Sequence, residues 1–215
     1  MIPMAQFRSA SVPWAVLALG AALTPYILLE KKLLPLSWWL PVSKAYFWPL
    51  MLPNYLLRVL RYGSDGYFTD VDRDVILGAV PMVIAGHVEL LHRDGVRAVV
   101  NLQAEYDGPL HAYAAVQPPI EQLRLPVTDH TEPSVEVLQR AVAFIAHHRS
   151  MGHRVLVHCK GGHGRSAAVA AAWLIRSKNM TPTGAQQFLS SIRHVRKSLY
   201  RQEDILQFTR AIHQD

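Results

Sequence analysis

Two patterns of hydrophobic and polar positions divide the chain. After about residue 62, short apolar runs rich in Val and Leu alternate with longer segments whose apolar positions recur every three or four residues. Runs of the first kind are typical of buried strands, and segments of the second kind are typical of amphipathic helices. Strands are therefore expected at 74–80, 96–102, 122–127 and 153–157, and helices at 87–93, 135–148, 165–175, 182–194 and 201–213.

The order of these elements predicts an α/β fold. Residues 122–157 have the pattern of strand, helix and strand, and Ser134 and Gly152 are suited to begin and end the helix. Two strands joined by a crossover helix are parallel. We expect residues 62–215 to form one domain with a central, mainly parallel sheet flanked by helices. The proline- and aromatic-rich segment 106–119 is interpreted as a loop.

The first 61 residues differ in composition from the rest. Residues 9–29 carry no charged side chain, and a second apolar run, 33–60, is interrupted by four prolines. Four of the five tryptophans lie in this extension. Tryptophans with basic neighbours, here Lys44, are typical of a membrane–water interface. A membrane-spanning helix needs about 20 apolar residues, a length that 9–29 just reaches.

We predict that residues 1–61 form an apolar, membrane-associated or targeting extension. Three alternatives remain for this segment: a helical cap packed on the domain, a cleaved signal peptide and a mitochondrial targeting segment. The signal peptide is disfavoured because free-cysteine chemistry favours a reducing compartment. The mitochondrial targeting segment stays open: the chain has no acidic residue up to Leu29, but this stretch is poor in arginine.

Charge and composition narrow the class of partner. The net charge of +6 fits an acidic partner, such as a phosphorylated substrate or an anionic membrane surface. No nucleic-acid-binding module is recognisable, so nucleic acid is not expected as a partner. The eleven histidines are scattered, and neither a metal nor a cofactor is expected. The single cysteine excludes an intramolecular disulfide.

The candidate chemistry lies where an apolar strand runs into His158 and Cys159, five residues before Arg165. A glycine-rich loop between a strand and a helix can turn its N–H groups inward as an anion-binding nest at the positive end of the helix dipole. A thiol placed there has a pKa below its ordinary value of about 8.5. The arginine fork suits a phosphate, and the Ser166 hydroxyl can hydrogen-bond the sulfur. The loop residues that would surround the phosphate are Lys160, Gly161, Gly162, His163 and Gly164.

Each part of this motif also has an ordinary explanation. A single cysteine is usually a small buried hydrophobe, and a glycine cluster is usually a turn. Their combination, with a strand before and a helix after, favours a phosphate cradle over a nucleophilic sulfur. The motif of His-Cys, five residues and Arg-Ser resembles the signature of the cysteine-dependent protein-tyrosine-phosphatase superfamily. Thiol-dependent arsenate reductases and rhodanese-like enzymes use a similar loop, but the former need a second cysteine, which this chain lacks.

Cleavage of a phosphate ester also requires a proton for the leaving alkoxide. Asp129 is the candidate acid, because it directly follows the third expected strand and would lie beside the cradle if that strand neighbours the fourth. The alternative for Asp129 is a loop-capping role. Glu132 and Asp107 are the reserve candidates. Lys160 and, when protonated, His163 would add positive charge beside the cradle.

Motifs outside the cradle point to one branch of this superfamily. The chain resembles the mitochondrial-type phosphatidylglycerophosphate phosphatases, a dual-specificity branch of that superfamily, over about residues 46–208. The segments that carry the resemblance, besides the cradle and the aspartate loop, are 77–81, 96–100, 105–106 and 121–125. The chain departs from the family pattern at Ala104, an ordinarily acidic position, and at His163, where an arginine is frequent.

The resemblance assigns roles to individual residues. It implies that Cys159 is the nucleophile, Arg165 the phosphate clamp and Asp129 the acid. It also implies that Glu105 and Tyr106 belong to the substrate pocket.

The resemblance further implies hydrolysis of phosphatidylglycerophosphate to phosphatidylglycerol, a step toward cardiolipin, through a phosphocysteine intermediate. The expected partners are the phosphorylated lipid and a membrane: the mitochondrial inner membrane in a eukaryote, or the cytoplasmic membrane face in a bacterium. The alternatives are a phosphoinositide phosphatase, a phosphotyrosine or phosphoserine protein phosphatase, and a non-catalytic, membrane-anchored phosphate-binding adaptor. Intact Cys159 and Arg165 argue against the adaptor. The sequence makes no prediction of the oligomeric state.

Overall fold

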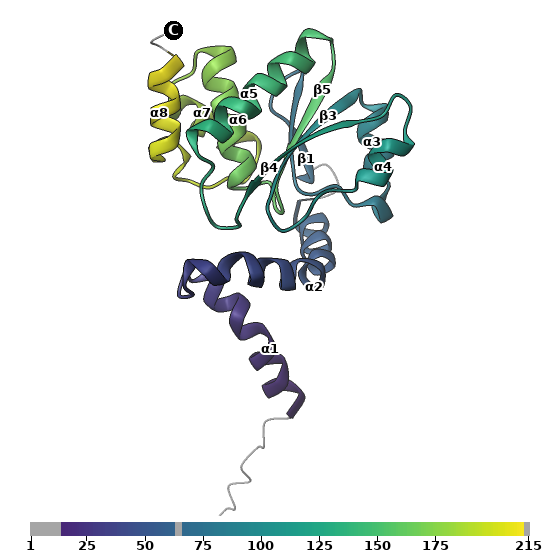
Figure 1. The fold of residues 1–215 in the computed structure, drawn as a ribbon, viewed down its shortest axis with the longest axis vertical. Coiled ribbons are helices and arrows are strands. Elements are labelled where there is room, and N and C mark those ends of the chain that lie inside the picture. Colours follow the sequence, from purple (N-terminus) through teal and green to yellow (C-terminus); the bar gives the residue numbers. More distant parts are fainter. Residues whose placement is uncertain (1–13, 63–65, 213–215) are drawn as a thin grey trace, which may run out of the picture.

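The computed structural model of the chain describes residues 14–62 and 66–212. Two helices, α1 (Trp14–Glu30) and α2 (Leu36–Tyr62), precede a sheet that has helices on both of its faces (Figure 1). The strands are β1 (Phe68–Asp70), β2 (Val75–Gly78), β3 (Val96–Gln103), β4 (Glu121–Val127) and β5 (Arg154–His158). The helices that follow α2 are α3 (His87–Arg93), α4 (Leu110–Ala115), α5 (Val135–Ser150), α6 (Arg165–Lys178), α7 (Pro182–Ile192) and α8 (Glu203–Ile212), with 3₁₀ turns η2 (Val83–Ala85) and η3 (Leu199–Arg201).

The strands lie in the order β1-β2-β5-β3-β4. Strands β2 and β3 flank β5 in parallel, β4 is parallel to β3, and β1 is antiparallel to β2. The predicted α/β fold with a mainly parallel sheet is therefore confirmed. The expectation that β4 and β5 are neighbours is wrong, because α5 carries the chain past β3, which pairs with both.

Alternate residues of the central strand β5 face two separate cores, because side chains along a strand point to opposite faces. Val155 and Val157 belong to a cluster with buried side chains of α5, α6 and α8. Leu156 packs on the other face, with side chains of α3 and with Tyr113 of α4. Strand β5 is thus covered on both faces. The loop that carries the candidate chemistry begins at its C-terminal end.

Most predicted elements agree with the structure to within a few residues. Ser134 caps α5, and its side chain accepts a hydrogen bond from the N–H of Val137 at 3.4 Å. Two expectations were wrong. The segment 106–119 contains α4, a helix of 6 residues, which is too short to show a clear period. The last helix begins at Glu203, after a 3₁₀ turn, and not at Arg201.

Helix α2 packs its buried apolar side chains on the domain. This helix contains Pro41, Pro49 and Pro53, and it turns toward the sheet in Figure 1. Prolines bend helices because they remove a backbone donor and crowd the preceding turn. Phe47 and Met51 of α2 are buried in one cluster with Val80, which follows β2.

No helix within the described ranges is both long enough and apolar enough to cross a bilayer. Helix α1 covers much of the apolar stretch predicted at 9–29, and residues 9–13 of that stretch lie outside the described residues. Residues 63–65, next to the predicted domain boundary between 61 and 62, also lie outside them.

Candidate active site

Strand β5 and helix α6 hold the glycine-rich loop between them. Strand β5 ends at His158, Cys159 follows with only 3% of its surface exposed, and α6 begins at Arg165. The Sγ atom of Cys159 accepts hydrogen bonds from the Gly162 N–H and from the Ser166 hydroxyl, both 3.2 Å long. The sulfur therefore lies at the N-terminal end of α6, where backbone donors and the helix dipole favour an anion.

The surroundings of Cys159 favour its thiolate. Burial alone would raise the pKa of this thiol, but the charge of Arg165 and the hydrogen bonds from Ser166 outweigh burial, and the pKa lies below its ordinary value. The preceding His158 is fully buried, and burial lowers its pKa to about 3. His158 is therefore neutral and adds no charge to the loop.

Gly162 and Arg193 fix the shape of the loop. Gly162 has a φ of +71°, and a Cβ atom there would lie 2.6 Å from a backbone carbonyl oxygen of β2. Both conditions require glycine. The Nε–H of Arg193 donates to the Gly162 carbonyl at 3.1 Å. Its Nη1 donates to the Gly66 carbonyl and to the Thr69 hydroxyl, both at 2.9 Å. The sequence interpretation missed Arg193, although basic residues cluster around it.

Arg165 is held by two carboxylates. Its Nη1 and Nη2 donate to the two oxygens of Glu105 at 2.8 and 2.7 Å, and Nη2 also donates to Asp129 Oδ1 at 2.8 Å. The Glu105 side chain is fully buried. Glu105 therefore orients Arg165 from behind and does not face open solvent, which corrects the expectation that it contacts the substrate. A carboxylate buried this deeply requires a paired cation.

Asp129 lies between several cationic groups. Its Oδ2 is 3.8 Å from the Nζ of Lys160 and 3.8 Å from the Nε2 of His130. Burial alone would raise the pKa of Asp129, but Arg165, His130 and Lys160 together bring the pKa below its ordinary value. A bound phosphate dianion would compete for Arg165 and repel the carboxylate. Phosphate binding would therefore raise the pKa of Asp129 and favour its protonated, proton-donating form.

A cavity of about 280 Å³ opens at the sulfur. Its walls come from the glycine-rich loop, the Asp129 loop and the N-terminal helices. The lining residues are Tyr26, Glu30, Asn54, Asp129, His130, Cys159, Lys160, Gly161, His163, Gly164, Arg165 and Arg196. The sequence interpretation missed Tyr26, Glu30 and Asn54, because isolated polar residues in an apolar segment carry no signal of a site. It also missed His130, which follows the predicted acid Asp129, and Arg196, which lies in a basic cluster.

Lys160 lies between the extension and the acid loop. Its Nζ donates to the Tyr26 hydroxyl at 3.2 Å and lies 4.8 Å from the centre of the Tyr26 ring. Burial, and then the interactions with Glu30, raise the pKa of Tyr26, so its phenol stays protonated. The Nζ atom of Lys160 is thus directed toward Tyr26 and Asp129.

Tyr106 lies outside the lining of this cavity. Its ring stacks on Phe47 of α2 with ring centres 4.9 Å apart, and Trp48 meets it edge-on at 5.4 Å. These three rings line a separate apolar cavity of about 300 Å³, together with Met51 and Ile84. The expectation that Tyr106 belongs to the pocket of the reacting phosphate is therefore corrected. The ring of Tyr106 instead packs the domain against Phe47 and Trp48 of α2.

The two reserve acids do not line the cavity, and each forms an ion pair. Asp107 pairs with Arg124 at 2.8 Å. Glu132 pairs with Arg196 at 3.4 Å. Asp129 therefore remains the candidate acid.

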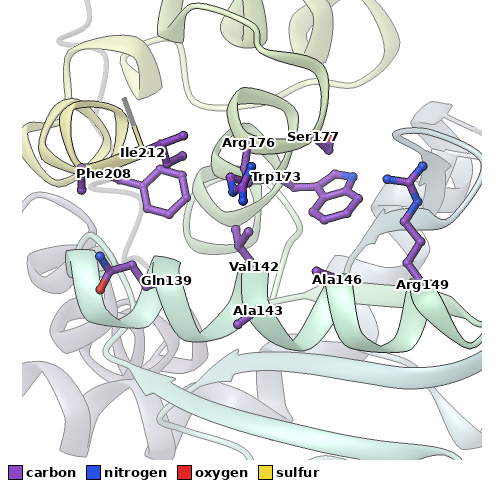
Figure 2. A pocket seen from close by; sticks show the side chains of 11 residues that line it. Gln139, Val142, Ala143, Ala146, Arg149, Trp173, Arg176, Ser177, Phe208 and Ile212 are labelled. Atoms are coloured by element: carbon purple, nitrogen blue, oxygen red, sulfur yellow. The ribbon is translucent and has the colours of Figure 1, made fainter. Parts of the chain in front are cut away.

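A second groove lies between α5, α6 and α8 (Figure 2). Its lining includes Val142, Phe208 and Trp173, and the Arg149 guanidinium lies 5.6 Å from the centre of the Trp173 ring. The groove is lined by neither a thiol nor a carboxylate, so it offers no phosphatase chemistry. Across the described ranges, no group of three or more His, Cys, Asp or Glu side chains is placed to hold a metal ion.

Comparison with known families decides what kind of protein carries this site. Residues 76–210 match the family model described as the dual specificity phosphatase catalytic domain. The chain belongs to the dual specificity phosphatase family. It is therefore a cysteine-dependent phosphatase, and the family resemblance read from the sequence is confirmed.

Individual relatives are about a third identical to this phosphatase over the aligned residues. It is 31% identical over 163 residues to the Homo sapiens protein named phosphatidylglycerophosphatase and protein-tyrosine phosphatase 1, covering 72% of this chain and 81% of that one. It is 32% identical over 152 residues to phosphatidylglycerophosphate phosphatase PTPMT1 of Arabidopsis thaliana, covering 70% of this chain and 44% of that one. The phosphatase thus spans less than half of the plant relative.

The solved structures agree with this assignment. The crystal structure of PTPMT1 matches with a TM-score of 0.58 at 29% identity, over 69% of this chain and 97% of that one. The crystal structure of PTPMT1 in complex with PI(5)P matches with a TM-score of 0.60 at 27% identity, over the same shares, 69% and 97%.

Proposed function

We propose that this phosphatase hydrolyses phosphatidylglycerophosphate to phosphatidylglycerol. The observation that carries the proposal is that a phosphatase cradle and a solvent-exposed apolar surface occur in one chain whose relatives are named for this lipid. A cradle that holds one phosphomonoester suits any phosphatase. An apolar surface beside it suits a substrate that stays in a bilayer.

The geometry supports a two-step reaction. The Cys159 thiolate attacks phosphorus while Arg165 and the loop N–H groups bind the non-bridging oxygens. The bond between phosphorus and the glycerol oxygen breaks, and Asp129 gives its proton to that oxygen. Water then attacks the phosphocysteine and transfers a proton to Asp129, which releases inorganic phosphate and restores the thiolate. A non-catalytic adaptor would not need a thiol with a lowered pKa beside an acid.

The proposal includes attachment to a membrane. Large apolar side chains of α1, α2, the connection between them and η2 are exposed, an arrangement that is unusual on a monomeric soluble protein. They are Ile27, Leu33, Leu36, Trp38, Trp48, Leu52, Leu56, Leu57, Leu60, Val83 and Ile84. Lys31, Lys32 and Lys44 are exposed on the same segment. Apolar residues flanked by lysines fit an anionic bilayer surface, which would be the mitochondrial inner membrane in a eukaryote or the cytoplasmic membrane face in a bacterium.

The membrane attachment predicts a specific loss of vesicle binding. Leu57 and Leu60 are 67% and 82% exposed, so replacing both with glutamate should leave the fold intact. Burying a leucine contributes roughly 1.5–3 kcal/mol, so the double variant should partition at least about tenfold less onto vesicles that contain phosphatidylglycerol. The matched control is Leu110→Glu in α4, where the leucine is 50% exposed. Binding is measured by vesicle sedimentation, and hydrolysis of 4-nitrophenyl phosphate reports on folding. A full-length chain that stays in the supernatant would refute the attachment.

The substrate proposal predicts an order of catalytic efficiencies. In matched mixed micelles, kcat/KM should be highest for phosphatidylglycerophosphate, lower for a phosphoinositide monophosphate and lowest for a phosphotyrosine peptide. The phosphoinositide is the second candidate, because one matching structure is a complex with PI(5)P. A tenfold higher kcat/KM for the phosphoinositide or the peptide corresponds to about 1.4 kcal/mol of transition-state preference. That result would show that the substrate assignment is wrong, and only the phosphatase class would stand.

A further inference from the structure

Glu30 and His130 form the wall of the cavity next to Asp129. The carboxylate Oε1 of Glu30, the last residue of α1, lies 3.5 Å from the Nε2 of His130. That nitrogen lies 3.8 Å from Asp129 Oδ2. Both residues line the cavity together with Cys159. Neither belongs to the glycine-rich loop, and the two-step reaction does not use them.

This wall lies where the position of Asp129 leads us to expect the alcohol part of a phosphate ester. A general acid must lie within hydrogen-bonding reach of the oxygen that it protonates. Side chains beside Asp129 therefore meet the leaving group, whereas the non-bridging phosphate oxygens meet Arg165 and the N–H groups of the loop. Glu30 and His130 are placed to recognise what is attached to the leaving oxygen.

His130 has an uncommon backbone conformation and a buried ring nitrogen without a hydrogen-bond partner among the described residues. Its φ is +65°, in the left-handed region that residues other than glycine seldom adopt. Such conformations are concentrated at functional sites. The Nε2 atom is buried, and it has no hydrogen-bond partner in the part of the chain that the structure describes. Its distance to Glu30 is longer than an ordinary N–H···O hydrogen bond.

A hydroxyl group matches this pair, because it donates one hydrogen bond and accepts others. We infer that Glu30 and His130 bind a hydroxyl of the leaving alcohol, which donates to Glu30 and accepts from His130. For phosphatidylglycerophosphate, whose role as substrate rests on the function proposed above, this group is the free hydroxyl of the terminal glycerol. Tyr26, which contacts both Lys160 and Glu30, holds α1 against the loop. The extension is thereby part of the substrate site as well as a membrane attachment.

The test removes the hydroxyl and the carboxylate separately and together. The full-length chain is assayed on phosphatidylglycerophosphate and on its analogue with hydrogen in place of the free glycerol hydroxyl. The soluble pair of glycerol 3-phosphate and its 2-deoxy analogue is assayed in parallel. Hydrogen bonds to charged groups predict that the wild type prefers the hydroxyl substrate by about ten- to a hundredfold in kcat/KM. Glu30→Ala should reduce this preference to less than about threefold, because the variant lacks the carboxylate to which the hydroxyl would donate.

The matched control is Glu89→Ala, which removes an exposed glutamate of α3 that does not line the cavity and should keep the wild-type preference. Glu89→Ala should leave kcat/KM for 4-nitrophenyl phosphate within about twofold of the wild type. Glu30→Ala should lose much less kcat/KM on 4-nitrophenyl phosphate, whose leaving group has no such hydroxyl, than on the substrate that carries the hydroxyl. A Glu30→Ala variant that keeps the full hydroxyl preference overturns the inference. Equal slowing of all substrates also overturns it, because Glu30 would then only position the Asp129 loop.

The proposed function can fail independently of this inference. If the wild type does not prefer phosphatidylglycerophosphate over other lipids, the substrate assignment is wrong, and the soluble pair still decides whether Glu30 reads a hydroxyl. If the wild type shows no hydroxyl preference on either pair, the inference is wrong even where the lipid assignment stands.

Discussion

Replacing Cys159 with serine is expected to abolish turnover while the protein still binds its substrate. Loss of a catalytic nucleophile lowers kcat by roughly 10⁴- to 10⁶-fold, because a serine hydroxyl in this loop is not ionised as the cysteine thiol is. Binding should persist, since Arg165 remains paired with Glu105 and the loop N–H groups keep their positions. The measurement combines turnover on phosphatidylglycerophosphate with the affinity of the inactive variant for vesicles containing that lipid.

Trapping the intermediate provides the direct check of this first prediction. Rapid acid quenching of the wild type with labelled substrate should place the phosphate on Cys159, and the Cys159→Ser variant should carry no label. Arg165→Ala should lose binding as well as turnover, because it removes the guanidinium that holds the phosphate. Stable label on a histidine or a serine of the wild type would rule out the phosphocysteine mechanism.

The second large effect is expected for Asp129→Asn, and it should depend on the leaving group. On a lipid with an alkoxide leaving group, kcat/KM should fall about 10²- to 10⁴-fold, the usual contribution of a general acid. On 4-nitrophenyl phosphate the loss should be only a few-fold, because nitrophenolate leaves without a proton. The matched control is Asp107→Asn, which changes an aspartate that pairs with Arg124 outside the cavity lining. Equal losses on both substrates would remove Asp129 from this role.

The pH profile gives an independent readout of Asp129. The acid must be protonated, so kcat/KM for an alkyl phosphate falls as pH rises through the pKa of Asp129 in the unliganded enzyme. Burial alone would raise this pKa, but Arg165, His130 and Lys160 bring it below the ordinary value. The fall should therefore set in at a lower pH than an ordinary aspartate would give. It should be absent from the profile of Asp129→Asn, measured from about pH 2.5 to 9, a range that extends below the ordinary aspartate value of about 3.9 and above the ordinary thiol value of about 8.5.

The parts of the site that sequence reasoning predicted are local in the chain. Cys159, Arg165 and the glycines between them lie on one loop, so their spacing alone specifies a strand, a nest and a helix N-terminus. The main strands and helices were predicted for the same reason, since their periodicity is a property of consecutive residues.

The parts that sequence reasoning missed depend on contacts between distant segments. Glu105 reaches Arg165 only because β3 lies between β4 and β5, and the order of strands cannot be read from one strand at a time. Tyr26 and Glu30 precede the loop by about 130 residues and occur in a segment whose composition signals only a membrane. The helix α4 was missed because its six residues fall below the length at which a period is recognisable.

The side-chain hydrogen bonds from Arg193 to Gly162, Gly66 and Thr69 limit where this chain can be shortened for biochemical work. They join the catalytic loop at Gly162 to Gly66 and Thr69, at the very beginning of the domain. A fragment that starts after Gly66 loses one of these acceptors and loosens the loop, although every residue of the loop is still present. A fragment that starts between α2 and Gly66 keeps the three bonds but discards Tyr26 and Glu30. Expression designs that trim the N-terminus for solubility would therefore alter the catalytic loop, the substrate wall or both.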